Sequence, residues 1–203
     1  MRLDEKTAVI VVDMQNDFCS SEGALAGLGA DVSRNQEVAA RLPFFLQRAR
    51  EKGALVIWIL QNARAEFVSE ARRERASAMG RGVTAIAAAG TWGAELYDGL
   101  VPQPGDVALE KSKYSAFVGT PLRNLLQARA RTKLVVCGTA ANVCVDSTVR
   151  DAYMADFTVA LPRDLVGSTR AALGESAIEN LGIYFCEVVE SEEIVAAESD
   201  VVL

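Results

Sequence analysis

Three residues in this sequence carry side chains that together supply a nucleophile, a base and a cation. Asp13 ends the apolar run TAVIVVD, Lys111 ends the run VALEK, and Cys144 follows the run KLVVCG after a short turn. A carboxylate can accept the proton of a thiol, while a nearby ammonium group and a helix N-terminus both favour the thiolate. The trio therefore predicts nucleophilic attack on an amide or carbamoyl carbon, through an acyl-enzyme that water releases.

Each of the three residues also has an ordinary structural interpretation. Asp13 would then be a loop cap, Lys111 a surface lysine and Cys144 a small buried hydrophobic residue, as free cysteines usually are. These interpretations lose weight because Asp13 and Lys111 end predicted strands and Cys144 lies just past one, and the carboxyl ends of parallel strands share one edge of a sheet. Backbone N–H groups in the turn GTAANVC would complete such a site as an oxyanion hole.

The chain contains no histidine among its 203 residues. This excludes Ser-His-Asp and Cys-His catalytic systems and removes the most common ligand of catalytic zinc. Catalysis would have to rely on Cys, Lys, Asp, Glu, Tyr or backbone groups. We therefore predict an enzyme that uses neither a metal ion nor a cofactor.

The overall composition is that of one domain, over residues 1–203, with a large core, since half of the residues are hydrophobic. A net charge of −6 argues against nucleic acid or an anionic membrane as partner. No segment reaches the roughly 20 apolar residues of a membrane span, and the first residues do not resemble a signal peptide. Scattered cysteines predict a reduced, cytoplasmic setting, with three of them structural: Cys19, Cys137 and Cys186.

Apolar, β-branched runs alternate with segments of helical periodicity along most of the chain. Strands are predicted over 7–13, 54–60, 107–111, 133–138, 157–161 and 183–189, and helices over 35–53, 120–130, 142–155, 169–181 and 191–197. Asp31 and Ser33 are candidate caps for the first of these helices, and Thr120 for the second. The alternation predicts a three-layer, doubly wound α/β domain with about six mostly parallel strands. The section 61–104 is less regular, and within it 65–82 reads as a charged surface helix or lid.

The three blocks AVIVVDMQNDFC, DVALEKSKYSAFVGTPLRNLL and LVVCGTAANVCVDSTVRDAYMADFTVALPRD carry a family resemblance, in order and in spacing. The sequence resembles the isochorismatase-like cysteine hydrolases, which include N-carbamoylsarcosine amidase, ureidoacrylate and biuret amidohydrolases, and nicotinamidases. The shorter stretch TWGAEL also fits. The likeness therefore covers most of the chain.

The resemblance implies a role for each residue at the motif positions. Asp13 corresponds to the general base, Lys111 to the lysine that polarises thiol and substrate, and Cys144 to the nucleophile. It also implies a cis peptide bond at Thr139–Ala140, which aims the Ala140 amide, together with that of Cys144, at the oxyanion. Family members usually form dimers or tetramers, so a homodimer or homotetramer is expected.

Two departures from family patterns narrow the expected reaction. Nicotinamidases bind a metal through histidines after the second strand, where this chain reads WILQNARAEF. Isochorismatases proper need no nucleophilic cysteine, whereas Cys144 is present here. Both departures favour hydrolysis of a C–N bond in a small amide, carbamoyl or ureido compound. Vinyl ether hydrolysis of the isochorismatase type, and a non-catalytic member of the fold, remain as alternatives.

The substrate-facing residues are less well marked in the sequence. Phe18 resembles a position in the pocket wall of the family, although an ordinary core aromatic is an equal interpretation. Gln61, Asn62 and Tyr114 follow predicted strands and are candidates to line the pocket. Arg64 could pair with a substrate carboxylate, but a surface arginine is the more common case.

Overall fold

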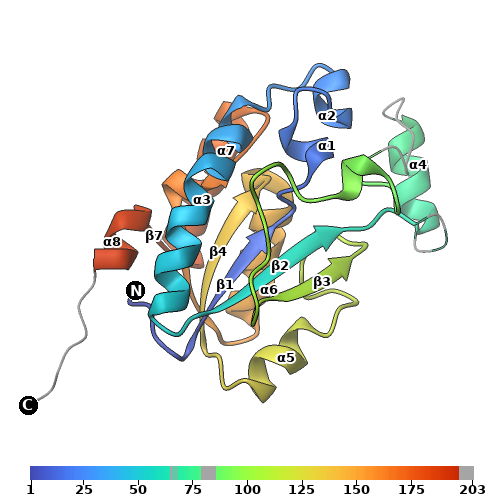
Figure 1. Cartoon of the computed structure of the whole chain (residues 1–203). Helices are drawn as coiled ribbons and strands as arrows, with labels where there is room; N and C mark the ends of the chain where they lie inside the picture. Colours follow the sequence, from blue (N-terminus) through green and yellow to red (C-terminus); the bar gives the residue numbers. More distant parts are fainter. Residues whose placement is uncertain (65, 67, 79–85, 197–203) are drawn as a thin grey trace, which may run out of the picture.

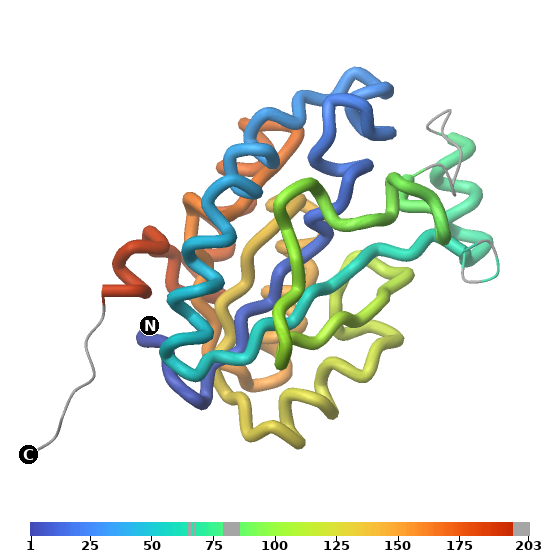
Figure 2. The backbone as a smooth tube through the Cα atoms, viewed as in Figure 1, coloured from blue at the N-terminus to red at the C-terminus, as the bar shows by residue number. Residues whose placement is uncertain are grey.

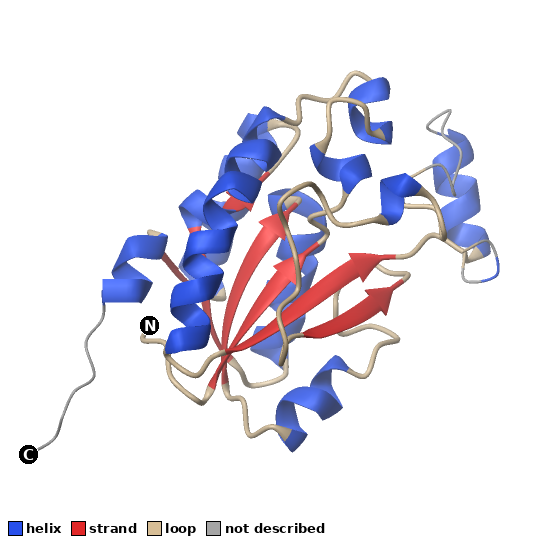
Figure 3. Cartoon of the chain, viewed as in Figure 1, coloured by secondary structure: helices blue, strands red, loops and turns tan. Residues whose placement is uncertain are grey.

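A parallel β-sheet forms the centre of the computed structural model, which describes residues 1–64, 66, 68–78 and 86–196 (Figures 1 and 3). Its strands follow the order β3-β2-β1-β4-β5-β7, with β6 beside β4, and every strand pair in the described part of the chain is parallel. The strands are β1 Thr7–Val12, β2 Leu55–Gln61, β3 Val107–Lys111, β4 Lys133–Thr139, β5 Thr158–Pro162, β6 Val166–Gly167 and β7 Glu187–Val189. The predicted doubly wound α/β class is confirmed.

Helices cover both faces of the sheet, which makes three layers (Figure 1). Side chains of α3 and α8 pack on one face, and those of α5, α6 and α7 pack on the other. The helices are α1 Asn16–Cys19, α2 Ala24–Gly27, α3 Ser33–Glu51, α4 Glu70–Ala78, α5 Leu122–Ala128, α6 Asp146–Met154, α7 Ala171–Tyr184 and α8 Ser191–Ala196, with short turns η2 Trp92–Ala94, η3 Ala141–Val145 and η4 Arg163–Leu165. None of the described helices combines the length and the apolar character needed to cross a bilayer.

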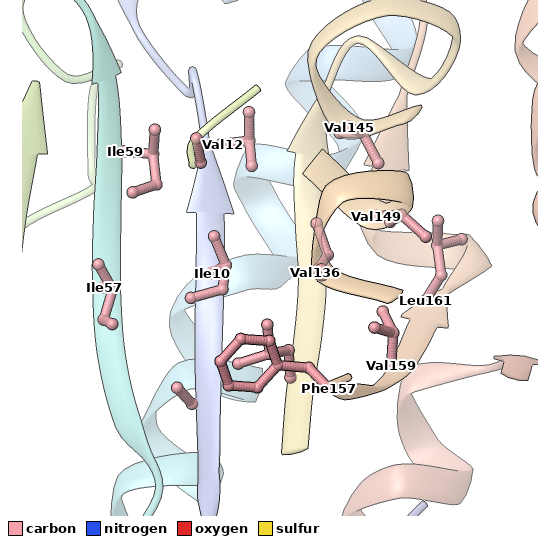
Figure 4. Packing of buried hydrophobic residues seen from close by; sticks show 14 of the residues in the cluster. Ile10, Val12, Ile57, Ile59, Val136, Val145, Val149, Phe157, Val159 and Leu161 are labelled. Carbon is pink, nitrogen blue, oxygen red and sulfur yellow. The ribbon is translucent and has the colours of Figure 1, made fainter. Parts of the chain in front are cut away.

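The core is divided by the sheet into two halves, because alternate residues of a strand point to opposite faces. Ile10, Ile57 and Val136 lie on the α6 face, where they meet Val149 of α6 and Leu161 of β5 (Figure 4). The intervening residues of the same strands point to the α3 face. This explains why the central strands read as continuous apolar runs: both of their faces are buried.

On the α3 face, α3 does not cover the whole sheet. Figure 2 shows residues 86–106, in green, passing across this face toward β3. Leu100 of this segment is buried in the same cluster as Trp58 of β2. At its end, the Asp106 carboxylate accepts hydrogen bonds from Trp58 Nε1 at 2.9 Å and from Arg50 Nη2 at 2.7 Å. The later part of the section that lacks a regular pattern in the sequence therefore covers part of the α3 face of the sheet.

The strand order reverses between β1 and β4, because the chain runs from β1 outward to β2 and β3 and then returns to β4 on the other side. Such a switch point leaves a crevice at the carboxyl ends of the two strands. Gly138, near the end of β4, has φ of +107° and lies so close to Val12 that an added Cβ would sit 2.2 Å from the Val12 carbonyl oxygen. Only glycine allows this close approach.

Several predicted boundaries differ from the structure. The strand predicted over 183–189 is wrong in its first half, because α7 continues to Tyr184 and β7 begins at Glu187. The short apolar run IYF has no period that separates strand from helix, and the packing of Phe185 against Tyr153, with ring centroids 5.6 Å apart, follows the helix. The helix predicted over 142–155 divides into the π-type turn η3 and α6.

Two predicted helices are only partly as expected. In α3 the Asp31 carboxylate accepts a hydrogen bond from the Ser33 amide at 2.9 Å, while Val32 occupies the cap position. Pro43 lies inside this helix without ending it. The charged segment 65–82 contains α4, which has no buried residue, and residues 65, 67 and 79–82 lie outside the described part of the chain.

Candidate active site

Asp13, Lys111 and Cys144 meet at the carboxyl ends of the strands. The Lys111 ammonium nitrogen lies 2.8 Å from Asp13 Oδ2 and 3.5 Å from Cys144 Sγ. All three residues are buried, with exposed fractions of 1%, 2% and 7% in chain order. The structure therefore brings together the three groups that the sequence selected, and it places them in the interior.

The strand register explains how a lysine on β3 reaches a carboxylate beyond β1. Lys111 pairs with Gln61 of β2, and β2 lies between β3 and β1. Asp13 follows β1 with φ of +52°, and its amide donates to the Ile59 carbonyl at 2.9 Å. The long lysine side chain thus spans the end of β2 to reach Asp13. A shorter cation on β3 would not bridge two strand spacings of about 4.8 Å each.

Three oxygen atoms accept hydrogen bonds from the Lys111 ammonium group. These are Asp13 Oδ2, Gln61 Oε1 at 3.0 Å and the Lys113 carbonyl at 3.1 Å. An ammonium group has three N–H donors, so these contacts hold it in one orientation beside the sulfur. Burial alone would lower the pKa of Lys111, but Asp13 and Cys144 beside it raise that pKa above its ordinary value. Lys111 is therefore the fixed positive charge of the site.

The environment of Asp13 suits a base. Burial raises the pKa of Asp13, and the opposing effects of Lys111 and of hydrogen bonds do not cancel that rise. Asp13 Oδ1 is buried and has no nitrogen or oxygen partner among the described residues, which leaves it available to the neighbouring thiol. A carboxylate with a raised pKa binds a proton more readily than an ordinary one. Asp13 can thus take the proton of Cys144.

The resting state of Cys144 differs from the sequence expectation. Burial raises the pKa of the Cys144 thiol well above its ordinary value, the Asp13 charge raises it further, and Lys111 only partly opposes them. The position just before α6 and the nearby ammonium group favour thiolate, but burial outweighs both in the free protein. Burial therefore favours the neutral thiol, and Asp13 is the carboxylate beside it.

The turn before Cys144 is held from both sides. The peptide bond between Thr139 and Ala140 is cis, as the family resemblance implied. The Ala140 carbonyl accepts hydrogen bonds from the amides of Val143 and Val145, at 3.0 and 3.1 Å. On the other side, Thr139 Oγ1 lies 3.1 Å from Asn35 Oδ1 of α3. The backbone that leads from β4 to the nucleophile is thus packed between α3 and η3.

The structure brings one of the four candidate pocket residues into contact with the trio. Gln61 is buried and bonded to Lys111. Asn62 instead donates to Glu110 Oε2 at 2.5 Å, and Tyr114 is 54% exposed with Arg72 5.8 Å above its ring. Phe18 is half-buried and packs with the core on the α3 face.

Arg64, the further candidate, pairs with Glu110 on the surface. This matches the surface interpretation of that residue.

The comparisons with known proteins agree with this geometry. The family model described as Isochorismatase domain matches residues 7–193. The chain belongs to the isochorismatase family.

Among its relatives is ureidoacrylate amidohydrolase RutB of Enterobacter sp. (strain 638), which is 36% identical over 168 residues, or 75% of this chain and 71% of that protein. A cysteine hydrolase from Pseudomonas syringae pv. phaseolicola 1448A superposes with a TM-score of 0.83 at 28% identity, covering 94% of this chain and 91% of the other. Pyrazinamidase of Pyrococcus horikoshii in complex with zinc has a TM-score of 0.77 at 28% identity, covering 91% and 99%.

The zinc of that pyrazinamidase raises the question of whether this isochorismatase-family chain could bind a metal. The sequence has no histidine, and the described residues contain no group of three or more Cys, Asp or Glu side chains arranged to hold an ion. Within the site, Gln61 is bonded to Lys111, and an ammonium group so near would repel a cation. These residues do not fit a zinc site.

Sequence reasoning missed the buried polar residues that follow Asp13. The Gln15 side chain accepts a hydrogen bond from the Gln61 amide at 2.8 Å and donates to the carbonyls of Gln61 and Ala94, at 3.0 and 2.6 Å. Asn16 Nδ2 donates to the Trp92 carbonyl at 2.8 Å. These contacts attach the segment around η2 to the carboxyl ends of β1 and β2.

Asp17 continues this pattern, because its carboxylate accepts hydrogen bonds from the amides of Ala24 and Ala87, at 2.9 and 2.7 Å. An added Cβ on Gly93 would sit 2.3 Å from this carboxylate, so the glycine allows the close packing. The signal in the sequence was the polar run QND, which begins three residues after the buried strand β1. Such a run usually indicates a loop, but here every member is buried.

Proposed function

We propose that this isochorismatase-family hydrolase is a metal-independent cysteine amidohydrolase, which cleaves a C–N bond of a small amide, carbamoyl or ureido substrate through a Cys144 acyl-enzyme. The buried contact of Lys111 with both Asp13 and Cys144 is the observation that carries the proposal. The names of relatives support it: RutB is an amidohydrolase, and the Pseudomonas syringae protein is a cysteine hydrolase. Cytoplasmic location and homo-oligomerisation stay predictions.

In the first half of the reaction, Asp13 accepts the thiol proton of Cys144 as the sulfur attacks the carbonyl carbon. The carbonyl π electrons move to oxygen, and a tetrahedral oxyanion forms. When the C–N bond breaks, its electron pair goes to nitrogen, which takes the proton from Asp13 and leaves as ammonia or an amine. The neutral resting thiol makes this concerted transfer necessary, because free thiolate is scarce at neutral pH.

In the second half, Asp13 accepts a proton from water, whose oxygen attacks the thioester carbon. Collapse of the second tetrahedral intermediate breaks the C–S bond, and the sulfur recovers its proton from Asp13. The enzyme returns to its starting state, with water consumed and no redox change. The same carboxylate thus serves as base and acid in both halves, which suits its raised pKa.

Lys111 stays protonated throughout and contributes charge. It lies 3.5 Å from Cys144 Sγ, so it stabilises the negative charge that develops on sulfur during attack and during release. The backbone amides of Ala140 and Cys144 are proposed to hold the oxyanion. Support for this comes from the family resemblance and from the bonds that fix the Ala140 carbonyl.

The proposal is tested by measuring ammonia release over a panel of primary amides, ureas and ureido acids with purified protein. Cys144→Ala is expected to abolish release, and Cys144→Ser to lower it strongly, because a hydroxyl is far less acidic than a thiol. Ammonia release that persists in Cys144→Ala would overturn the cysteine mechanism. Pyruvate formed from isochorismate at equal rates by wild type and Cys144→Ala would instead select vinyl ether hydrolysis.

Metal independence is tested by the same assay after prolonged treatment with a strong chelator. Unchanged ammonia release is expected. Loss of activity that added zinc restores would contradict this part of the proposal. If the panel yields neither ammonia nor pyruvate, the non-catalytic alternative is favoured.

A further inference from the structure

Gln61 makes contacts at the site that the reaction scheme above does not use. Its side chain is buried, with 4% of the residue exposed, and its Oε1 accepts a hydrogen bond from Lys111 at 3.0 Å. Its backbone amide and carbonyl are both bonded to the side chain of Gln15. Backbone and side chain of Gln61 are therefore held together in one arrangement beside Lys111.

The direction of the Gln61 amide group follows from chemistry. An ammonium group has only donors, so the atom that faces Lys111 must be the oxygen, and Nε2 must point elsewhere. Gln61 Nε2 is buried and has no hydrogen-bond partner among the described residues. A buried donor without a partner is unfavourable by an amount similar to a lost hydrogen bond, so such a group marks a position where a ligand can supply an acceptor.

The place of this donor in the site defines which part of a substrate it would meet. Lys111 contacts both Gln61 Oε1 and Cys144 Sγ, so the Gln61 amide is separated from the nucleophile by one nitrogen atom. β2, which carries Gln61, lies on the far side of β1 from β4, which leads to the proposed oxyanion hole. Gln61 Nε2 would therefore meet not the scissile carbonyl but a second acceptor on the other side of the nucleophile.

We propose that Gln61 Nε2 donates a hydrogen bond to a second, uncharged carbonyl oxygen of the substrate, and that the preferred substrates are acylureas or similar compounds with two carbonyl groups. This inference rests on the proposed amidohydrolase function and deepens it. A donor in this position discriminates strongly, because a compound without the second acceptor leaves Nε2 unpaired when it binds and excludes water.

An uncharged acceptor fits the site better than a carboxylate. The charges of Asp13 and Lys111 compensate one another, and all three Lys111 donors are engaged by protein oxygens. Arg64, which follows the same strand, is 44% exposed and is paired with Glu110. A buried anion beside Gln61 would have only a neutral donor, which does not offset the loss of its hydration.

N-acetylurea and N-ethylurea form a matched pair of probes, because they differ only at one carbon. This carbon is a carbonyl group in N-acetylurea and a methylene group in N-ethylurea. The consumption of each urea by wild type, Gln61→Glu and Gln61→Met is followed by NMR. Gln61→Glu keeps the oxygen that accepts from Lys111 and replaces the Nε2 donor by oxygen, whereas Gln61→Met removes both. Gln103→Glu, on the exposed segment before β3, makes the same chemical change away from the site.

Wild type is expected to prefer N-acetylurea, and Gln61→Glu is expected to reduce kcat/KM for it about ten- to hundredfold more than for N-ethylurea. Gln103→Glu should leave both values unchanged. An equal reduction for the two ureas in both Gln61 variants would overturn the inference and leave Gln61 as a positioning residue for Lys111. Circular dichroism of each variant checks that the fold is retained.

A binding measurement separates this inference from the proposed function. The affinities of Cys144→Ala and of Cys144→Ala/Gln61→Glu for both ureas are compared by calorimetry, which needs no turnover. If Gln61→Glu lowers the affinity for N-acetylurea but not the affinity for N-ethylurea, the inference is supported, even where N-ethylurea reacts too slowly for its turnover to be measured. Absence of turnover in wild type contradicts the proposed function, whereas equal affinity of both Cys144→Ala proteins for N-acetylurea contradicts the inference alone.

Discussion

Lys111 Nζ and Asp13 Oδ2 are 2.8 Å apart in the interior of the protein, although their residues come from β3 and from the end of β1, with β2 between them. Neither side chain is more than 1% exposed. A buried pair of this kind depends on both of its members, because loss of either leaves an uncompensated charge. The same pair therefore contributes to the stability of the sheet at the carboxyl ends of its strands and to the reaction proposed for Cys144.

Lys111→Met is expected to lower the free energy of unfolding by about 3–5 kcal/mol at pH 8, because Asp13 would remain buried and unpaired. The loss should shrink at lower pH, where the unpaired carboxyl takes up a proton. Urea denaturation at two pH values measures both effects. Lys133→Met, which removes a pair with the partly exposed Asp4, is the control and should cost about 1 kcal/mol or less. Similar losses in the two variants would contradict the prediction.

The pH dependence of activity should report Asp13. The proposed base must be ionised, so kcat/KM rises with pH through the pKa of Asp13, which burial raises above its ordinary value. The acid limb should therefore lie above the range of about pH 4 expected for an ordinary aspartate. Asp13→Asn should reduce kcat/KM about 10²- to 10⁴-fold. A residual activity that keeps the same acid limb would show that another group titrates.

Gly138→Ala is expected to destabilise the protein more than Gly119→Ala. Both glycines have positive φ values, +107° and +72°, but an added Cβ at Gly138 would sit 2.2 Å from the Val12 carbonyl, whereas the space around Gly119 is open. Backbone strain of about 1–3 kcal/mol applies to both, and the steric clash only to Gly138. Thermal denaturation compares the two. Because β1 and β4 would have to separate at the switch point, kcat should fall only in Gly138→Ala.

Gln15→Met tests the contacts that attach the η2 segment to β2. The variant has a similar volume but leaves the Gln61 amide and the carbonyls of Gln61 and Ala94 without the partner they have now. A loss of about 2–4 kcal/mol in the free energy of unfolding is expected, since each unpaired buried group costs about 1–3 kcal/mol. Gln103→Met, at an exposed position, should change stability little. Equal stability of both variants would mean that water replaces these bonds at no cost.

Much of the fold followed from local patterns. The runs TAVIVV, LVIWILQ and KLVVCGT became β1, β2 and β4, because strands covered on both faces need continuous apolar sequence. Local patterns do not locate the end of α7, since Ile183 and Tyr184 are apolar and yet exposed at the end of a helix. The two-residue strand β6 is too short to leave a pattern. Pairing with β4 alone defines it.

The residue types of the site could be selected from the sequence, but not their environment. Gln61, Asn62 and Tyr114 had equal standing as candidates, and only the packing of β2 against β3 turned Gln61 inward while Tyr114 remained on the surface. The roles of Gln15 and Asp17 depend in part on backbone groups more than 40 residues away in the chain, which no local pattern records.

By itself, the sequence determined the alternation of strands and helices and the placement of Asp13, Lys111 and Cys144 at or just past the ends of strands, because apolar periodicity and residue chemistry are local properties. Only the tertiary structure decided that Lys111 spans β2 to reach Asp13, and that burial raises the pKa of the Cys144 thiol. It also decided that Gln61 Nε2 is buried without a hydrogen-bond partner among the described residues. Distances, burial and hydrogen-bond partners come from strand order and register, which bring distant segments together and exclude water from the groups where they meet.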